Sequence, residues 1–291
     1  MSFRIAIASG KGGTGKTTVS VNLYHFLAAN DGLRISLLDC DVEEPNDAIF
    51  FPDASLVKEV EIFRDLPVID TDKCTFCRRC VEYCEFNAIV VIPPANYAEV
   101  NASLCHSCGA CIVACNESAI TERKETIGKM TSFRPERNMN LIEGRLKIGS
   151  SMQTMVIKEL KKSAPADDDI TLFDAPPGTS CPVVETIHDA DYVILVTEPT
   201  LFGLHDLKLM VELLEEMDKE FGVVINKAGL GDQSLYDYLQ SNQLEVLGEI
   251  PFSQEYAGLY AKGDILNKIP QEIKNSYQSI VEAMELRRSK K

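Results

Sequence analysis

Eight of the ten cysteines stand in two short runs that share one spacing. Each run reads C-x-x-C-x-x-C-x-x-x-C, and the second follows the first by 31 residues. Ala88-Ile89 recurs at the same offset as Ala119-Ile120, which indicates an internal duplication. The runs are Cys74, Cys77, Cys80 and Cys84, then Cys105, Cys108, Cys111 and Cys115.

This spacing is typical of thiolates that hold cuboidal iron-sulfur clusters. Three cysteines with two residues between neighbours wrap one face of a [4Fe-4S] cluster, while the fourth points away and reaches the neighbouring cluster. The alternative is a pair of structural Zn(Cys)4 sites, but those usually use paired C-x-x-C elements instead of triplets. The predicted ligand sets are Cys74, Cys77, Cys80 and Cys115 for one cluster, and Cys105, Cys108, Cys111 and Cys84 for the other.

On these residues, the stretch from 65 to 124 resembles the bacterial two-cluster ferredoxins. It departs from them in one respect, because Glu85 and Asn116 stand where those proteins usually carry a proline after the fourth cysteine. The resemblance implies a small α+β domain whose clusters transfer electrons at low potential.

A second motif, near the start of the chain, is a glycine-rich loop that satisfies G-x-x-x-x-G-K-[ST]. It lies between a predicted strand, Arg4–Ala8, and a predicted helix from Thr17 to about Ala29. Glycines let backbone N–H groups close around phosphate, Lys16 neutralises the terminal phosphates, and the hydroxyl of Thr17 ligates Mg²⁺. The alternative is a flexible surface loop. The residues are Gly10, Lys11, Gly12, Gly13, Thr14, Gly15, Lys16 and Thr17, followed by Thr18.

Three aspartates follow predicted strands. Asp39 and Asp41 come after Ile35–Leu38, and Asp174 comes after Ile170–Phe173. Because a parallel sheet collects its ligand groups at the carboxyl ends of its strands, these carboxylates should converge on Mg²⁺ and the γ-phosphate. Helix capping is a credible alternative for Asp39 alone.

The additional lysine at position 11 resembles the "deviant Walker A" loop of the MinD, ParA, Mrp and nitrogenase-iron-protein class of P-loop ATPases. The resemblance implies that Lys11 reaches across an ATP-dependent homodimer to the partner's phosphates. It also implies that Asp41 orients the attacking water, that Asp39 supports the Mg²⁺ shell, and that Asp174 to Gly178 form the second switch segment.

The base site is implied by the same resemblance. Asn226 matches the adenine-contacting asparagine of the class, and Pro251 lies in its base-flanking loop. Gly229 stands where the aspartate of a guanine-reading N-K-x-D motif would be, so ATP is expected rather than GTP. In overall plan the chain resembles the members of this class that contain an inserted ferredoxin domain.

The pattern of apolar stretches predicts an α/β fold with a parallel sheet flanked by helices. The expected ATPase domain is discontinuous, with residues 1–64 and 125–291, and the ferredoxin-like domain occupies 65–124. Further strands are expected at 192–196, 223–225 and 246–250, and helices at 152–162, at 207–221 and near the end of the chain.

Charge and hydropathy narrow the partners. A formal charge of -15 would repel nucleic acid. No apolar run approaches the roughly 18 residues of a membrane span, and Ile5–Ala8 leads into the glycine loop instead of forming a signal peptide. Eight clustered cysteines without an export signal favour metal ligation in the reducing cytoplasm.

Three functions are compatible with these motifs. ATP hydrolysis could gate electron delivery to an unidentified redox protein or metalloprotein, or drive assembly or transfer of iron-sulfur clusters. A MinD-like positioning role is the third, although Glu282 to Lys291 is basic only at its tip. Cys181 lies seven residues after Asp174, where the nitrogenase iron protein has a cluster ligand; the alternative is a buried core thiol. Cys40 is expected in the core.

Overall fold

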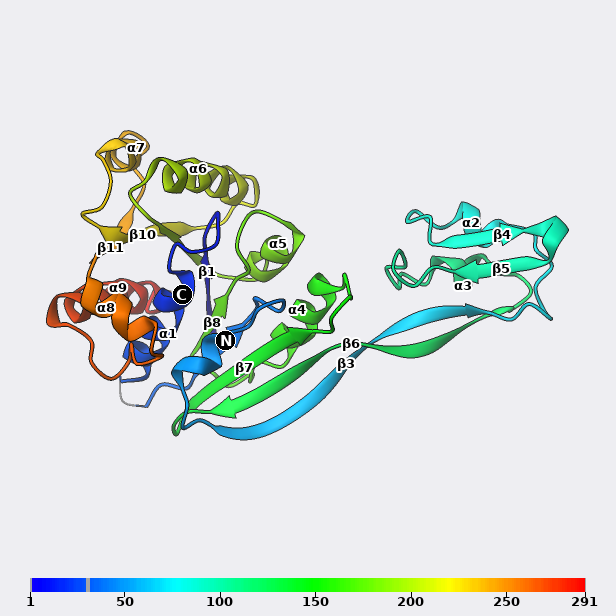
Figure 1. The fold of residues 1–291 in the computed structure, drawn as a ribbon, viewed down its shortest axis with the longest axis horizontal. Helices are drawn as coiled ribbons and strands as arrows, with labels where there is room; N and C mark the ends of the chain where they lie inside the picture. Colours follow the sequence, from blue (N-terminus) through cyan, green and yellow to red (C-terminus); the bar gives the residue numbers. More distant parts are fainter. Residues whose placement is uncertain (1, 30–31, 291) are drawn as a thin grey trace. The chain divides into compact units, whose positions relative to one another are not determined.

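The computed structural model describes residues 2–29 and 32–290. The chain divides into two compact units (Figure 1). Unit 1 comprises Met1–Glu59, Met130–Arg145 and Thr154–Lys291, and unit 2 comprises Val60–Lys129 and Leu146–Gln153. Unit 2 thus includes the predicted segment 65–124 and extends beyond it on both sides.

The main sheet of the described chain has nine strands in the order β11-β10-β9-β1-β8-β2-β7-β6-β3. From β11 to β7, each strand pairs in parallel with its neighbour. The bounds are β1 Phe3–Ala8, β2 Ile35–Asp39, β3 Ser55–Ile69, β6 Ile120–Arg134, β7 Met139–Leu146, β8 Ile170–Asp174, β9 Tyr192–Thr197, β10 Phe221–Ala228 and β11 Val246–Pro251.

Helices cover both faces of this sheet, with α1, α8 and α9 on one face and α5, α6 and α7 on the other (Figure 1). Every residue of β2, β8 and β9 is buried, as expected for central strands of a parallel sheet. The helices are α1 Lys16–Ala28, α4 Gln153–Lys162, α5 Cys181–Ile187, α6 Leu201–Glu216, α7 Ser234–Ser241, α8 Gln254–Tyr260 and α9 Gln271–Arg288, with a 3-10 turn η1 at Asp47–Phe50.

The register of the central strands brings their functional ends together. Ile7 of β1 and Asp39 of β2 both pair with Asp174 of β8. The glycine loop leaves β1 at this edge, between β8 and β9, where ligands of parallel α/β sheets bind. The predicted α/β fold with a parallel sheet flanked by helices is confirmed.

The helix predicted at 207–221 is misplaced, because α6 begins at Leu201 and ends at Glu216. Thr200 caps its start by accepting a hydrogen bond from the Gly203 N–H. Asp218 then adopts a left-handed backbone with φ 52°, and β10 begins at Phe221. Phe221, which was assigned to the helix, therefore belongs to β10, and the strand predicted at 223–225 is confirmed within it.

In unit 2, two short helices and a hairpin lie between the ends of β3 and β6. The helices α2, Arg79–Glu82, and α3, Ala110–Ala114, start 31 residues apart, as the duplication requires. The hairpin consists of β4, Ile89–Ile92, and β5, Tyr97–Val100, joined through η2, Pro93–Ala95. A small apolar core that contains Ile89, Val91 and Ile120 packs against cysteines of both runs.

Strands β3, β6 and β7 had no counterpart in the sequence prediction. The first half of β3 is exposed on both faces, so it lacks the alternation that signals a half-buried strand. Across residues 2–29 and 32–290, every helix is too short or too polar to span a bilayer.

Candidate functional site

A cleft of about 480 Å³ lies over the glycine loop in unit 1. Its floor is the loop itself, from Lys11 to Thr18, and Asp41, Asn226 and Pro251 also line it. The cleft thus collects residues from the ends of β1, β2, β10 and β11. Its volume falls in the range of small-molecule sites, about 300–1,000 Å³.

Four predicted residues, Gly10, Asp39, Asp174 and Gly178, do not line this cleft. Asp39 and Asp174 are buried beneath the loop, with 1% and 0% exposure. Gly178 supports the loop, since its N–H donates a hydrogen bond to the Ser9 carbonyl at 3.0 Å, and its φ of 92° suits glycine.

Asp174 gathers the functional groups of helix α1. Its carboxylate accepts hydrogen bonds from Lys16 Nζ at 2.9 Å, from Thr17 Oγ1 at 3.0 Å and from Ser20 Oγ at 2.9 Å. Burial lowers the pKa of Lys16, but Asp174, Asp41 and Asp39 outweigh it, and the net shift is upward. The lysine is therefore a fixed cation at the positive end of α1, as phosphate binding requires.

A third aspartate, which the sequence analysis missed, joins Asp39 and Asp174. Carboxylate oxygens of Asp39, Asp47 and Asp174 all lie within 4.8 Å of one another. Asp47 is fully buried, and neither of its oxygens has a hydrogen-bond donor among the described residues. A divalent cation with oxygen ligands would satisfy these carboxylates, so the donor set fits Mg²⁺.

Burial and mutual repulsion disturb the protonation of this group. Burial raises the pKa of Asp39 to about 8, and Asp174 adds to the rise. Burial also raises the pKa of Asp47 well above its ordinary value, with Asp39 the next cause. Asp39 accepts backbone N–H bonds from Asp41, Asn46 and Asp47, which hold the segment after β2 in place.

The predicted base-binding residues, Asn226 and Pro251, both line the cleft. Asn226 donates a hydrogen bond from Nδ2 to the Thr14 carbonyl at 2.7 Å, so it braces the phosphate loop. Pro251 leads into α8, whose residues Tyr256 and Tyr260 also line the cleft. An apolar and aromatic wall of this kind suits a planar base, and the sequence reasoning reached only its first residue.

Unit 2 contains two cavities, each lined by four cysteines. Each set has three cysteines from one run and the last cysteine of the other, which is the crossed pattern that the spacing predicts. Cys74, Cys77, Cys80 and Cys115 line the first cavity, and Cys105, Cys108, Cys111 and Cys84 line the second.

The backbone around both cavities is the same in detail. Amide N–H groups donate to sulfur at corresponding places, Phe76 to Cys74 and Ser107 to Cys105, each at 3.4 Å. Phe76 has φ 52° and Ser107 has φ 54°. Side-chain-bearing residues rarely adopt this strained conformation, and duplicated strain of this kind is common at functional sites. These features fit two cubane clusters.

Arg64 of β3 holds the backbone at the start of the second cysteine run, beside the second cavity. Its buried guanidinium donates to the carbonyls of Ala102 and Cys105, at 2.7 and 2.8 Å, and to Glu125 Oε2 at 2.7 Å. Among the described residues, no arginine donates an equivalent hydrogen bond to a carbonyl of the first run. The sequence analysis did not identify this residue.

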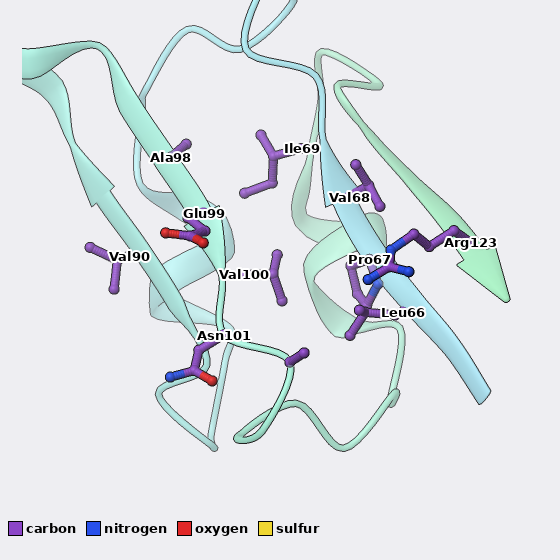
Figure 2. A pocket seen from close by; sticks show the side chains of 11 residues that line it. Leu66, Pro67, Val68, Ile69, Val90, Ala98, Glu99, Val100, Asn101 and Arg123 are labelled. Atoms are coloured by element: carbon purple, nitrogen blue, oxygen red, sulfur yellow. The ribbon is translucent and has the colours of Figure 1, made fainter. Parts of the chain in front are cut away.

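A hollow of about 630 Å³ lies between β3 and β5 in unit 2. Figure 2 shows the side chains of Ile69 and Val100 in the space between these strands. Ile69 also lines the first cysteine cavity, while Pro67 and Val100 also line the second. A single layer of apolar side chains therefore separates each cavity from this hollow, and such a layer influences cluster potential.

The two remaining cysteines differ from each other. Cys40 is buried, as predicted. Cys181 is exposed at the start of α5, so the alternative of a buried core thiol is wrong.

Comparison with known proteins places the whole chain among nucleotide-binding domains. The sequence profile described as the CobQ/CobB/MinD/ParA nucleotide binding domain matches residues 5–266. Two uncharacterised proteins of Methanocaldococcus jannaschii are similar along their length. One is 30% identical over 95% of this chain and 95% of its own. The other is 31% identical over 96% and 97%.

Solved structures show the same fold. The cell division ATPase MinD of Pyrococcus furiosus aligns with a TM-score of 0.60 at 20% identity, covering 98% of this chain and 99% of its own. The MinD of Pyrococcus horikoshii in complex with Mg-ADP aligns with a TM-score of 0.59 at 18% identity, covering 98% and 96%.

Shorter matches have names that refer to iron-sulfur chemistry. The polyferredoxin-like subunit of an aliphatic sulfonate oxidoreductase from Pyrococcus furiosus is 34% identical over 86 residues, which is 29% of this chain and 47% of that subunit. An iron-sulfur cluster carrier protein of the same organism is 49% identical over 49 residues, 17% of this chain and 16% of the carrier.

Proposed function

Because this chain belongs to the CobQ/CobB/MinD/ParA family of P-loop ATPases, we propose that unit 1 hydrolyses ATP and that unit 2 carries two [4Fe-4S] clusters for electron transfer. The observation that carries the proposal is the pair of cysteine cavities with crossed ligand sets, in a chain that also folds a phosphate loop into the floor of a cleft. The proposed domains are 1–64 with 125–291 for the ATPase and 65–124 for the ferredoxin-like part.

In the proposed ATPase site, Lys16 neutralises the β- and γ-phosphates, and Thr17 with the carboxylates of Asp39, Asp47 and Asp174 holds Mg²⁺ directly or through water. The cation supplies charge neutralisation of the terminal phosphates. Asp41 lines the cleft from the end of β2, where it can orient the attacking water. The structural neighbour from Pyrococcus horikoshii was solved with Mg-ADP, which supports binding of a nucleotide with Mg²⁺ in this cleft.

Lys11 gives a reason to propose an ATP-dependent homodimer. It lines the cleft with a side chain that is 30% exposed, and a second lysine is superfluous for phosphates that Lys16 already neutralises. In a sandwich of two protomers, Lys11 would reach the partner's nucleotide. We expect hydrolysis to be slow in the isolated chain and faster with its partner protein.

Chain connectivity offers a route for coupling. Asp39 fixes the backbone of Asn46 and Asp47, and this segment continues through η1 into β3, which ends in unit 2. Loss of γ-phosphate commonly alters the order of such segments in nucleotide switches. We propose that hydrolysis alters the segment before β3 and thereby gates electron transfer to a redox protein or metalloprotein in the cytoplasm.

The test is anaerobic purification followed by iron and sulfide counts and electron paramagnetic resonance, with and without Mg-ATP. We expect about eight iron and eight sulfide per chain, because each cubane cluster holds four of each. We also expect the cluster spectra or potentials to change with Mg-ATP. Zinc in place of iron would refute the cluster assignment, and spectra indifferent to nucleotide would refute the coupling.

A second candidate is an iron-sulfur assembly or carrier ATPase, which the short carrier match and the exposed Cys181 favour. This function requires at least one labile cluster. Prompt transfer of iron and sulfide from the loaded protein to an apo-ferredoxin would support it. Retention of both clusters would favour electron transfer.

A MinD-like positioning role is the third candidate, and the solved structures of MinD with the same fold support it. The apolar residues of α9, including Ile273, Tyr277 and Ile280, are buried in the core. The described part of this helix therefore keeps its principal apolar face for packing, and Lys291 lies outside the described residues. Sedimentation with anionic liposomes and ATP would test the role.

A further inference from the structure

Glu198 lies between two lysines beside the phosphate loop. Its Oε1 is 2.8 Å from Lys11 Nζ, and its Oε2 is 2.8 Å from Lys227 Nζ. Lys227 Nζ also donates to the Gly13 carbonyl at 2.9 Å. One carboxylate therefore joins the signature lysine to the strand that carries the base-site asparagine.

The position of Glu198 is tightly fixed. It follows the buried strand β9 and precedes Thr200, the cap of α6. A Cβ at Gly203 would stand 2.2 Å from the Glu198 carbonyl oxygen, so α6 approaches this backbone as closely as glycine allows. The Glu198 side chain is 13% exposed. Ordering this carboxylate therefore costs little additional conformational entropy.

Lys227 is held in a strained backbone conformation. Its φ is 55°, in the left-handed region that side-chain-bearing residues rarely adopt. Such strain persists where the surrounding contacts over-determine the position. Lys227 stands at an irregularity in the pairing of β10 with β11, and its Nζ bonds to Glu198 and Gly13 add to the contacts that hold it there.

The contact to Lys11 opposes the task proposed for that lysine. Burial raises the pKa of Glu198, but its bonds to Lys11 and Lys227 outweigh burial and keep it low, so the carboxylate is charged at neutral pH. A phosphate that approaches Lys11 Nζ from a second protomer meets this negative charge, with only 2.8 Å between the ammonium and the carboxylate oxygen. Two anions that contact the same ammonium lie close enough to repel each other appreciably at a protein surface.

We propose that Glu198 is a positioning residue that holds Lys11 in the isolated protomer, and that partner-bound phosphate must compete with it for this lysine. Glu198 thus sets a threshold for ATP-dependent dimerisation, an inference that rests on the homodimer proposed above. Lys227 keeps the carboxylate in place after Lys11 has left, so Lys11 can return once the phosphate is released.

The experiment compares Glu198→Gln with Glu216→Gln in the full chain. Glutamine keeps the shape of glutamate and removes its charge, and Glu216 is an exposed residue of α6 that provides the same change in net charge. The dimer dissociation constant in Mg-ATP is measured by analytical ultracentrifugation, and binding of fluorescent ADP to the monomer is measured in parallel. Both variants are repeated with Lys11→Ala.

We expect Glu198→Gln to tighten the Mg-ATP dimer about tenfold. Release of one partly exposed ion pair corresponds to about threefold, and each dimer contains two. ADP binding by the monomer should stay within about twofold, and Lys11→Ala should abolish the gain. Equal dimerisation of the two glutamine variants, or a gain that persists without Lys11, would overturn the inference. So would a parallel loss of ADP binding, which is the signature of a purely structural role. If the wild-type chain stays monomeric in Mg-ATP, the homodimer proposal itself fails.

Discussion

Replacement of Asp47 by asparagine should stabilise the nucleotide-free protein. Asp47 is fully buried, without a hydrogen-bond donor to either oxygen among the described residues, and its oxygens lie within 4.8 Å of those of Asp39 and Asp174. Two ionised carboxylates at this separation repel by about 3 kcal/mol at an effective dielectric constant of 20. Partial protonation of the carboxylates reduces this repulsion, so we expect Asp47→Asn to gain about 1–3 kcal/mol in the free energy of unfolding at pH 8.

The gain should depend on pH in a defined direction. Burial raises the pKa of Asp47 in the folded state above its unfolded value. The native state therefore binds this proton more tightly, and its contribution to stability is complete below about pH 4 and declines as pH rises toward the folded pKa. Asparagine does not titrate. The difference between variant and wild type should thus be smaller at pH 5 than at pH 8.

Thermal and chemical unfolding at both pH values, without nucleotide or Mg²⁺, provide the measurement. Asp53→Asn is the matched control, because Asp53 is exposed in the loop before β3. With Mg-ADP the wild type should become the more stable protein, since removal of one carboxylate weakens cation binding in the variant. The variant then needs a higher Mg²⁺ concentration for the same rise in its melting temperature. A variant that is equally destabilised at pH 5 and pH 8 would refute the reasoning.

Three further predictions follow from the same contacts. Arg64→Met should cost about 2–4 kcal/mol in the stability of unit 2, because it leaves the carbonyls of Ala102 and Cys105 without this donor and removes one partner of Glu125. The iron count should then fall toward about four per chain as the cluster beside Cys105 is lost, and an unchanged iron count would contradict this prediction. Cys115→Ser should remove the cluster of the first run and spare the other, which spectroscopy of the remaining cluster checks; loss of the second cluster alone would contradict the crossed ligand sets. Gly10→Ala should weaken ADP binding at least about tenfold, because its Cβ would stand 2.5 Å from the Asp206 carbonyl oxygen and displace the loop; unaltered calorimetric titration would argue against this.

The sequence was most informative where function depends on neighbours in the chain. The phosphate loop and the cysteine runs are local motifs, so their residues, and even the crossed cysteine sets, could be predicted from spacing. Asp47 could not, because it lies in η1, eight residues after Asp39, and reaches the cluster only through the turn that bonds its N–H to Asp39 and the pairing of β2 with β8 that places Asp39 beside Asp174. Arg64 escaped notice for the same reason, since its partners lie 38 to 61 residues away.

Glu198 carried a signal that was overlooked. It lies two residues beyond the end of the predicted strand 192–196, and the rule about strand ends that was applied to Asp39 and Asp174 extends to it. The misplaced helix α6 explains the omission, because a helix that starts at 207 leaves Glu198 in an unspecified loop. The capping threonine at 200 was the local evidence for the earlier start.

Both units contain features that are unfavourable in the empty polypeptide. Unit 1 buries three carboxylates within 4.8 Å, and unit 2 holds Phe76, Ser107 and their neighbours in left-handed conformations around open cysteine cavities. Folding alone would not select a buried, unpartnered Asp47, because a neutral residue there would be more stable. A bound cation would relieve the repulsion, and a bound cluster would give the strained loops a ligand to wrap. On the proposed function, part of the free energy of binding each group would offset this strain, and occupancy of a site would thereby change the stability of the segments around it.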